Sequence, residues 1–275
     1  MAITNYDGII AARAAGKADD VFTQKASVGW VKGDWHSYVM VAGQQASATY
    51  AAATSGGAIL SNTMRGAIPF KSCTGTDSKY LLSFAAGGIA GPEAAAFGLI
   101  DILWAGSSFL LNSSATQAIN SPELTRSTDG RYNKLGVMKR STSSTANTVT
   151  AWYTDAGGTA TSVNVVITTA GASGRLLPTG YLGAPIPNGI KSIQSAQAQT
   201  AQTAGIVDLM IFRVLDVIPA IGQYTWVEKD MTAQIDGLLQ LDIDSSKDCG
   251  YLSPVVLAAG ASGRPITFMI RTCAG

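Results

Sequence analysis

The chain has 275 residues, of which 47% are hydrophobic, enough for one large β unit or for two domains of about 100–150 residues. Only 13% of the residues are charged, against roughly 25% in typical soluble domains, and the net charge is +1. The basic residues are scattered rather than gathered in a stripe, so we expect no nucleic-acid partner. A surface with so little charge suits a protein that neighbouring subunits cover.

The cysteines and the apolar stretches further restrict the kind of protein that the sequence can encode. Cys73, Cys249 and Cys273 are too few and too far apart for a disulfide framework or a zinc site, although one pair could still close. The N-terminus lacks the basic and long apolar regions of a signal peptide. The longest apolar window, residues 94–111, is interrupted by Asp101, so we expect no membrane span.

The first residues predict a short helix. Thr4 and Asp7 have the spacing of a capping box, and Gly16 is placed to end the helix. One face of this helix carries Tyr6, Ile9, Ile10 and Arg13. Residues 27–43 then have the aromatic and β-branched side chains of strands. Because residues 1–70 contain few large apolar side chains, we interpret them as an N-terminal helix and an extended arm that does not fold alone.

From about residue 71 onward the sequence predicts an antiparallel β fold. Short apolar segments alternate with turns rich in Gly, Ser, Thr and Asn at roughly ten-residue spacing, as in a β-sandwich or barrel. Two of these segments are alike, "AAFGLIDIL" at residues 95–103 and "TAGIVDLMIF" at residues 203–212. We interpret the likeness as a divergent duplication, with coincidence as the alternative. The expected fold is mainly β, with two tandem jelly-roll-like antiparallel β-sandwich units at residues 71–178 and 179–275.

The second unit contains an insertion, "TWVEKDMTAQ", that predicts a helix. Thr225 and Glu228 have capping-box spacing, and Trp226, Met231 and Ile235 fall on one helical face. The hexapeptide "AGASGR" occurs at residues 170–175 and again at 259–264, which indicates shared turn chemistry.

Asp101 and Asp208 lie at matching places in the two similar segments. A strand carboxylate can face solvent, pair with an arginine, or accept backbone N–H groups, and each of these roles is structural. A catalytic role needs a second group with a shifted pKa in a cleft. We therefore predict that Asp101 and Asp208 are structural residues.

The sequence names no catalytic, cofactor-binding or metal-binding residue. His36 is the one histidine, and we expect it to be half-exposed in a strand rather than paired with a nucleophile. The segment "LDIDSSKDCG" spaces its acids like the start of a calcium loop but lacks the required Gly and the final Glu, so a turn is favoured. The five tryptophans could stack on sugars, but core or interface positions are favoured.

Several short motifs, in order along most of the chain, carry a resemblance. They are "MAITNYDGIIAARAAGK", "SKYLLSF", "LTRSTDGRYNKLGVMKRST", "TAWYTDAGGTATS" and "GIKSIQSAQ". Together they resemble a family of tailed-bacteriophage structural proteins that have an "L-x-R-Y-T-D-G-x-G" turn and a "Y-T-N-x-x-G" hairpin. Ser127 replaces the aromatic residue of that turn, and Asp155 replaces the Asn of the hairpin. The resemblance implies a virion protein, and it carries over no catalytic residue.

The leading functional hypothesis is a non-enzymatic capsid decoration or cement protein, located in the virion after assembly in the host cytoplasm. Its expected partners are the major capsid protein or other virion proteins, and copies of itself in a homo-oligomer, with a trimer favoured. The interface residues that we expect are Tyr6, Ile9, Ile10, Trp30 and Trp35. The alternatives are a neck, tail or fibre-associated component, a glycan-binding module on the virion surface, and a polysaccharide depolymerase.

Overall fold

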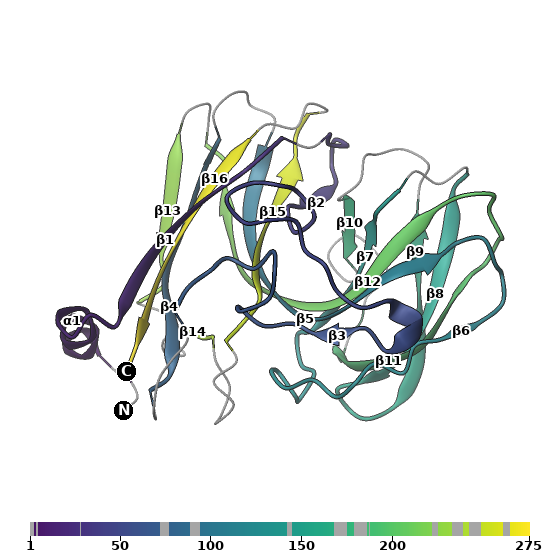
Figure 1. Cartoon of the computed structure of the whole chain (residues 1–275), viewed down its shortest axis with the longest axis horizontal. Helices are drawn as coiled ribbons and strands as arrows, with labels where there is room; N and C mark the ends of the chain where they lie inside the picture. Colours follow the sequence, from purple (N-terminus) through teal and green to yellow (C-terminus); the bar gives the residue numbers. More distant parts are fainter. Residues whose placement is uncertain are drawn as a thin grey trace.

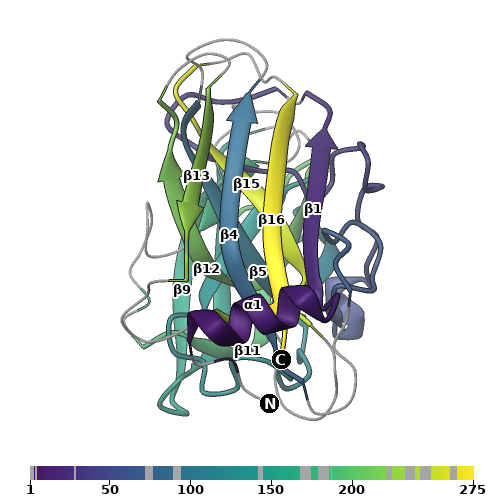
Figure 2. The same ribbon diagram turned by 90° about the vertical axis from the view of Figure 1, so that its left-hand side faces the viewer.

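The computed structural model describes part of the chain in detail, and Figures 1 and 2 show it from two directions. The described residues are 3, 5–27, 29–71, 77–88, 94–141, 145–167, 175–178, 186, 188–221, 225–232, 239–241, 249–260 and 265–275.

Within these residues the fold is mainly β, with one short helix, as the sequence predicts. The helix α1 spans Tyr6–Ala14, and a 3-10 turn η1 spans Ala53–Ser55. The strands are β1 (Ala18–Lys25), β2 (Trp35–Ser37), β3 (Ala58–Ile59), β4 (Lys79–Gly88), β5 (Ala94–Leu110), β6 (Gln117–Ala118), β7 (Lys134–Lys139), β8 (Asn147–Asp155), β9 (Ala160–Ile167), β10 (Arg175–Pro178), β11 (Ile190–Ala198), β12 (Ile206–Pro219), β13 (Trp226–Asp230), β14 (Leu239–Gln240), β15 (Leu252–Ala258) and β16 (Ile266–Ala274).

The described strands form three antiparallel sheets. A five-stranded sheet has the order β1-β16-β4-β13, with β14 also paired to β4. A four-stranded sheet has the order β6-β11-β8-β9. Between them lies a seven-stranded sheet of order β12-β7-β10-β2-β15-β5-β3, in which β12 also pairs with β5, so that its strands close into a ring.

The long strands β5 and β12 hold the fold together, and they carry the two similar segments. Each is apolar on both faces because each is covered on both sides, which is why the sequence shows continuous apolar runs rather than alternation. They pair with each other antiparallel over nearly their whole length, with Arg213 directly opposite Asp101. Three register shifts along this pair mark β-bulges, which bend the strands.

Two sandwich cores confirm the predicted β-sandwich class. One half of β5 and β12 packs with β7 against the four-stranded sheet, around residues such as Trp104 and Ile193. The other half packs with β15 against the five-stranded sheet, around Leu99 and Phe268. A third apolar cluster, which includes Trp35 and Phe212, fills the ring of the central sheet. Figure 1 shows the two sandwiches side by side, with β5 and β12 running through both.

The cores do not follow the order of the chain. The five-stranded sheet takes β1 from residues 1–70, β4 from residues 71–178, and β13, β14 and β16 from residues 179–275. The expected boundaries at residues 70 and 178 therefore cut across the sheets. The expected arm is also part of the fold, because β1 pairs with β16 along its full length and β2 lies within the ring.

The N-terminal helix forms where the sequence predicts it. The cap differs from the predicted Thr4, which lies outside the described residues: the side chain of Asn5 caps the helix by accepting the N–H of Gly8 at 2.9 Å. Gly16 follows the last turn with a φ of 69°. Figure 2 shows α1 lying across the lower ends of β4 and β16, on the outer side of the five-stranded sheet. There Ile9 and Ala12 pack on Tyr80, Leu82 and Cys273.

The predicted helix around residue 228 is wrong. Residues 226–230 form strand β13, which pairs with β4 in a register that sets Trp226 opposite Gly87. The indole of Trp226 lies over Gly87, where a Cβ atom would come within 2.7 Å of the ring. Pairing with the edge of a sheet has overridden the local capping signal. Ile235, the calcium-like segment at residues 242–248 and most of both "AGASGR" hexapeptides lie outside the described residues.

Candidate functional site

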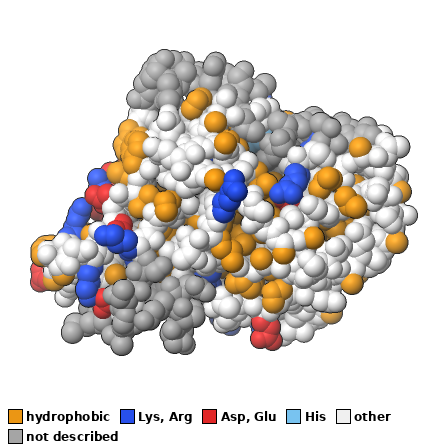
Figure 3. All heavy atoms as spheres, in the orientation of Figure 1, with side chains coloured by type: hydrophobic (Ala, Val, Ile, Leu, Met, Phe, Trp, Pro, Cys, Tyr) orange, Lys and Arg blue, Asp and Glu red, His pale blue; other side chains and the backbone are white. Residues whose placement is uncertain are grey.

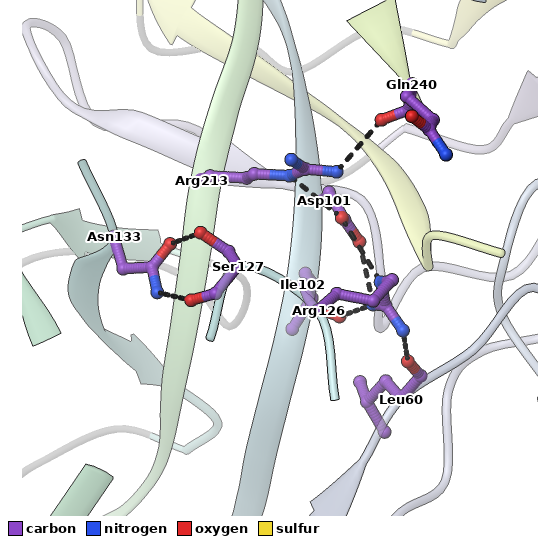
Figure 4. A network of polar contacts seen from close by, with 8 residues as sticks. All are labelled: Leu60, Asp101, Ile102, Arg126, Ser127, Asn133, Arg213 and Gln240. Carbon is purple, nitrogen blue, oxygen red and sulfur yellow. Dashed lines mark hydrogen bonds and ion pairs between the residues drawn. The ribbon is translucent and has the colours of Figure 1, made fainter. Parts of the chain in front are cut away.

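Asp101 lies at the centre of a buried ion-pair network (Figure 4). Its carboxylate is fully buried in the middle of β5. Arg126 donates from Nη2 to Oδ1 at 2.9 Å, and Arg213 donates from Nε to Oδ2 at 3.1 Å. The side chain of Arg126 is 1% exposed, so this pair is removed from water almost completely.

Both arginines also donate to backbone carbonyl groups, and they therefore tie separate segments to β5. Arg126 donates to the carbonyl of Leu60 at 2.6 Å and to that of Ile102 at 3.2 Å. Arg213 donates to the carbonyl of Gln240 at 3.4 Å. The guanidinium of Arg126 thus has acceptors on several sides, which a buried cation needs in order to be tolerated.

The turn that presents Arg126 is itself braced. The Asn133 side chain donates to the carbonyl of Ser127 at 3.2 Å and to that of Ile190 at 3.0 Å (Figure 4 shows the Ser127 contact). A Cβ atom at Gly189 would overlap the carbonyl oxygen of Gly130, so this approach needs glycine. The "LTRSTDG" motif of the sequence is therefore the support for the counter-ion of Asp101.

Asp208 has a different set of partners at the far end of the same strand pair. It accepts the N–H of Ser108 at 2.9 Å and the hydroxyl of Tyr50 at 3.0 Å. Arg140 lies 3.4 Å from its carboxylate, and the side chain of Arg140 is 30% exposed. Ser108 has a φ of 58° at a shift in the β5–β12 register, so Asp208 stabilises a β-bulge.

The two environments shift the two pKa values in opposite directions. Burial alone would raise the pKa of Asp101, but the charges of Arg126 and Arg213 outweigh it and hold that pKa below its usual range. Burial raises the pKa of Asp208, and the Ser108 N–H and Arg140 offset this only in part. Both carboxylates are engaged with their neighbours, which favours the structural roles predicted for them.

His36 is buried rather than half-exposed as we expected from the sequence. It lies in β2, where it is fully buried, and its Nε2 accepts the N–H of Val31 at 2.9 Å.

The predicted interface residues are divided between surface and core. Tyr6 and Ile10 are 59% and 64% exposed on α1, whereas Ile9 is buried beneath the helix. Trp30 and Trp35 are each 6% exposed. Trp30 donates its indole N–H to the Tyr38 hydroxyl at 3.1 Å. Of the five residues, only Tyr6 and Ile10 therefore present large surfaces to a partner.

The outer face of the five-stranded sheet extends this surface. We define the outer sheet face as Phe22, Met269 and Trp226 together with the charged residues Asp20, Arg271 and Glu228. Phe22 is 57% exposed and stacks on Trp226, with ring centroids 5.7 Å apart. Arg271 lies 2.7 Å from Glu228 and 3.7 Å from Asp20, next to α1. In Figure 3 the charged side chains gather on this side of the molecule, at the left, and the rest of the face has few.

Sequence reasoning missed several of these residues. The counter-ions Arg126 and Arg213 are 25 and 112 residues away from Asp101, and no local pattern connects them. The sequence around Arg213 offers one usable signal, because a cation inside an apolar strand needs an acceptor or an anion as its partner. Phe22 lies in a segment with no strong strand pattern, and the spacing around Trp226 predicts a helix rather than a strand.

The described residues contain no group of three or more His, Cys, Asp or Glu side chains that could hold a metal ion. They also contain no helix that is long and apolar enough to cross a membrane. Cys249 and Cys273 are buried thiols without a disulfide bond, and Cys73 lies outside the described residues.

Comparisons with known proteins identify no family for this chain. No protein-family profile and no curated protein sequence matches the chain. Among solved structures, infectious bursal disease virus of the Gx strain aligns with a TM-score of 0.21 and 8% identity, over 94% of this chain and 81% of that chain. The VP2 subviral particle of the same virus aligns with a TM-score of 0.15 and 8% identity, over 93% and 80%. Such low scores do not establish a shared fold, so the resemblance to tailed-phage structural proteins depends on its sequence motifs alone.

Proposed function

We propose that the chain is a non-enzymatic structural protein of a virion, assembled in the host cytoplasm, that decorates or cements the capsid. Its partners are the major capsid protein or other virion proteins. Copies of the chain associate as a homo-oligomer, with a trimer matching the local symmetry of a capsid lattice.

The observation that carries this proposal is the combination of α1 with the outer sheet face. Ile9 fixes the helix to the sheet, so that Tyr6 and Ile10 stand outward on a rigid support. Phe22 and Trp226 add a stacked aromatic pair to the same side of the molecule. Exposed apolar side chains that gather on one side, with paired charges between them, are typical of a surface that another protein covers.

The buried network around Asp101 supports the same reading. Through Arg126 and Arg213, it connects a turn, two long strands and the segment at Leu60 around one carboxylate. The turn is also one of the motifs that resemble tailed-phage structural proteins. An arrangement that ties distant segments together suits a protein that has to keep its shape inside a particle.

The test is the position and copy number of the chain in purified particles. We expect hundreds of copies in quantified gel bands and cryo-electron microscopy density over the head lattice. About ten copies, with density at the neck or tail, would contradict decoration and favour the neck or tail component. Release of reducing ends from host capsule by the purified protein would contradict the non-enzymatic role.

A pair of variants tests the surface itself. The double variant Tyr6→Glu with Ile10→Glu should remain folded, since both side chains are mostly exposed and only an exposed hydrogen bond between Tyr6 and Thr232 is lost, but it should fail to join particles. Val166→Glu is the matched control, because Val166 is 59% exposed on β9 of the other sandwich. Equal incorporation of the two variants would show that α1 is not the contact.

A further inference from the structure

Tyr132 is held in a conformation that its side chain disfavours. Its φ is 63°, in the left-handed region, where a bulky residue is an outlier. The other non-glycine residues with positive φ in the described chain are small and polar: Ser108, Asn120 and Ser127. Tyr132 is also 87% exposed, so its ring gains almost nothing from burial. Neither local preference nor packing accounts for a tyrosine at this position.

The surrounding turn enforces this conformation. Asn133 donates its backbone N–H to the carbonyl of Gly130 at 3.2 Å, and Ile190 donates to the same oxygen at 3.0 Å. The side chain of Asn133 donates to the carbonyls of Ser127 and Ile190. A non-glycine residue kept in the left-handed region by such over-determined surroundings is typical of binding sites.

A polar hollow of about 610 Å³ adjoins the Tyr132 ring. Its described lining includes Tyr132, Arg131, Asn188 and the bare backbone of Gly157 and Gly189. The side chain of Arg131 makes no hydrogen bond or ion pair with the described part of the chain, so its guanidinium is available to a ligand.

Asn188 is oriented by an anchored carboxylate. Its amide nitrogen donates to Asp155 Oδ2 at 3.0 Å, and Asp155 Oδ1 accepts the N–H of Thr159 at 2.8 Å. The hydrogen bond from Asn188, followed by that from Thr159, lowers the pKa of Asp155, so this acceptor keeps its charge at neutral pH. Because the Asn188 nitrogen is fixed, its carbonyl oxygen remains as an acceptor for a ligand hydroxyl.

We propose that this hollow binds an acidic saccharide. The apolar C–H face of a pyranose ring packs on an exposed aromatic ring, and Tyr132 offers one at the rim of the hollow. A uronic-acid carboxylate fits the planar fork of Arg131, which can donate two parallel hydrogen bonds to it. The Asn188 carbonyl accepts a sugar hydroxyl. This site lies apart from α1 and goes beyond the structural role proposed above.

The experiment is calorimetric titration of the full chain with two probes, a hexamer of galacturonate and the neutral hexamer maltohexaose. We expect the acidic hexamer to bind and the neutral one to bind about tenfold more weakly or not at all. Tyr132→Phe keeps the ring and should bind as the original chain does. Tyr132→Gly removes the ring and should weaken binding about tenfold or more.

Two controls separate binding from folding and from net charge. Tyr132→Gly relieves the left-handed strain, so its melting temperature should equal or exceed that of the original chain while binding is lost. Arg131→Ala should remove the preference for the acidic hexamer. Arg65→Ala, which removes another exposed arginine, should leave that preference intact.

The outcomes are distinct. Failure of the galacturonate hexamer to bind, equal binding of both hexamers, or undiminished binding by Tyr132→Gly would each overturn the proposal. Loss of particle incorporation by Tyr132→Gly without any saccharide binding would make the hollow a protein contact instead. Under the proposal, Tyr132→Gly joins particles normally, so failure here is distinguishable from failure of the structural role.

Discussion

Asp101 and Asp208 occupy matching places in two similar strands, yet their surroundings act on the carboxyl group in opposite directions. Asp101 faces two arginines and is stabilised in its charged form. Asp208 has one partly exposed arginine, and burial favours its neutral form. The same residue in the same sequence context therefore makes different contributions to stability.

This difference predicts unequal effects of the same substitution. Asp101→Asn leaves the buried Arg126 without its counter-ion and should lower the free energy of unfolding at pH 7 by about 3–5 kcal/mol. Asp208→Asn removes a charge that burial penalises, and Arg140 can turn to water, so the loss should be about 1 kcal/mol. Urea unfolding midpoints of both variants, at unchanged slope, give the comparison.

The dependence of stability on pH in the acid range tests the role of Asp101. The folded pKa of Asp101 is lowered, so its contribution is complete above the unfolded pKa of about 3.9 and is lost as the pH falls through the folded value. The difference in stability between the original chain and Asp101→Asn should therefore shrink below about pH 4. A difference that stays constant down to pH 2, or equal losses for Asn at 101 and 208, would contradict the proposed electrostatics.

The buried position of Lys25 predicts a second dependence of folding stability on pH. Its ammonium group is buried against the carbonyls of Val41 and Gln45, and burial lowers its pKa from 10.5 to about 8. Between about pH 8 and pH 10.4 the unfolded chain holds a proton that the folded chain has released, so stability rises with pH in this window. This gain in stability is complete above about pH 10.4 and is lost as the pH falls through about 8.

Lys25→Met should remove that rise, which amounts to about 3 kcal/mol at most. Urea midpoints at pH 7, 8.5 and 10 measure it, with Lys32→Met as a control at an exposed lysine. A rise with pH that persists in Lys25→Met and is unchanged in size would show that another group is responsible.

How much of the network could be predicted from sequence depends on distance along the chain. A lone carboxylate in an apolar run is visible locally, and the structural role of Asp101 follows from it. Its partners are not visible, because Arg126 and Arg213 reach it only after the strands have paired. The strain at Tyr132 is equally hidden, since it arises from contacts of its turn with Ile190.

At the scale of elements, α1 and β13 illustrate what local signals can and cannot decide. The helix α1 has its cap at Asn5 and its stop at Gly16, and local chemistry is enough to place it. The segment of β13 has helical spacing as well, but β4 offers it an open edge and a glycine to receive Trp226. Tertiary pairing outweighs weak propensity where both are present.

The helix α1 should act as a cover over Cys273. Ile9→Ser should weaken the packing of α1 on Tyr80 and Leu82, and should raise the rate at which iodoacetamide labels Cys273 about tenfold or more. Ile10→Ser alters the exposed side of the same helix and should leave the rate unchanged. Peptide mapping identifies the labelled cysteine. Equal labelling in the two variants would mean that α1 does not protect this end of the sheet.

At the scale of the molecule, the number of sandwiches is predictable and their composition is not. Strand spacing along the sequence indicates two sets of strands, and there are two sandwich cores. The duplicated segments contribute mainly to different cores, with Leu99 in one and Leu209 in the other, but the strands that contain them, β5 and β12, pair with each other and run through both cores. Register between segments more than 100 residues apart has no local signature.

Because β5 and β12 are shared, we expect both sandwiches to unfold in one step. Ile193→Ala in one core and Phe268→Ala in the other should each lower a single common midpoint. Far-ultraviolet circular dichroism and tryptophan fluorescence report it, with Trp104 in the first core and Trp30 in the second. Two separate transitions, or a variant that shifts only one signal, would show that the sandwiches are independent.

The pairing of β1 with β16 has a consequence for synthesis on the ribosome. The partner of β1 is made about 250 residues later, which at roughly 5–20 residues per second is a delay of about 12–50 s. Throughout that time β1 and the underside of α1 have no sheet to join, and their apolar side chains remain open to other nascent chains. A protein made in many copies at once would therefore depend on chaperones, or on a modest rate of translation, until its last strand emerges.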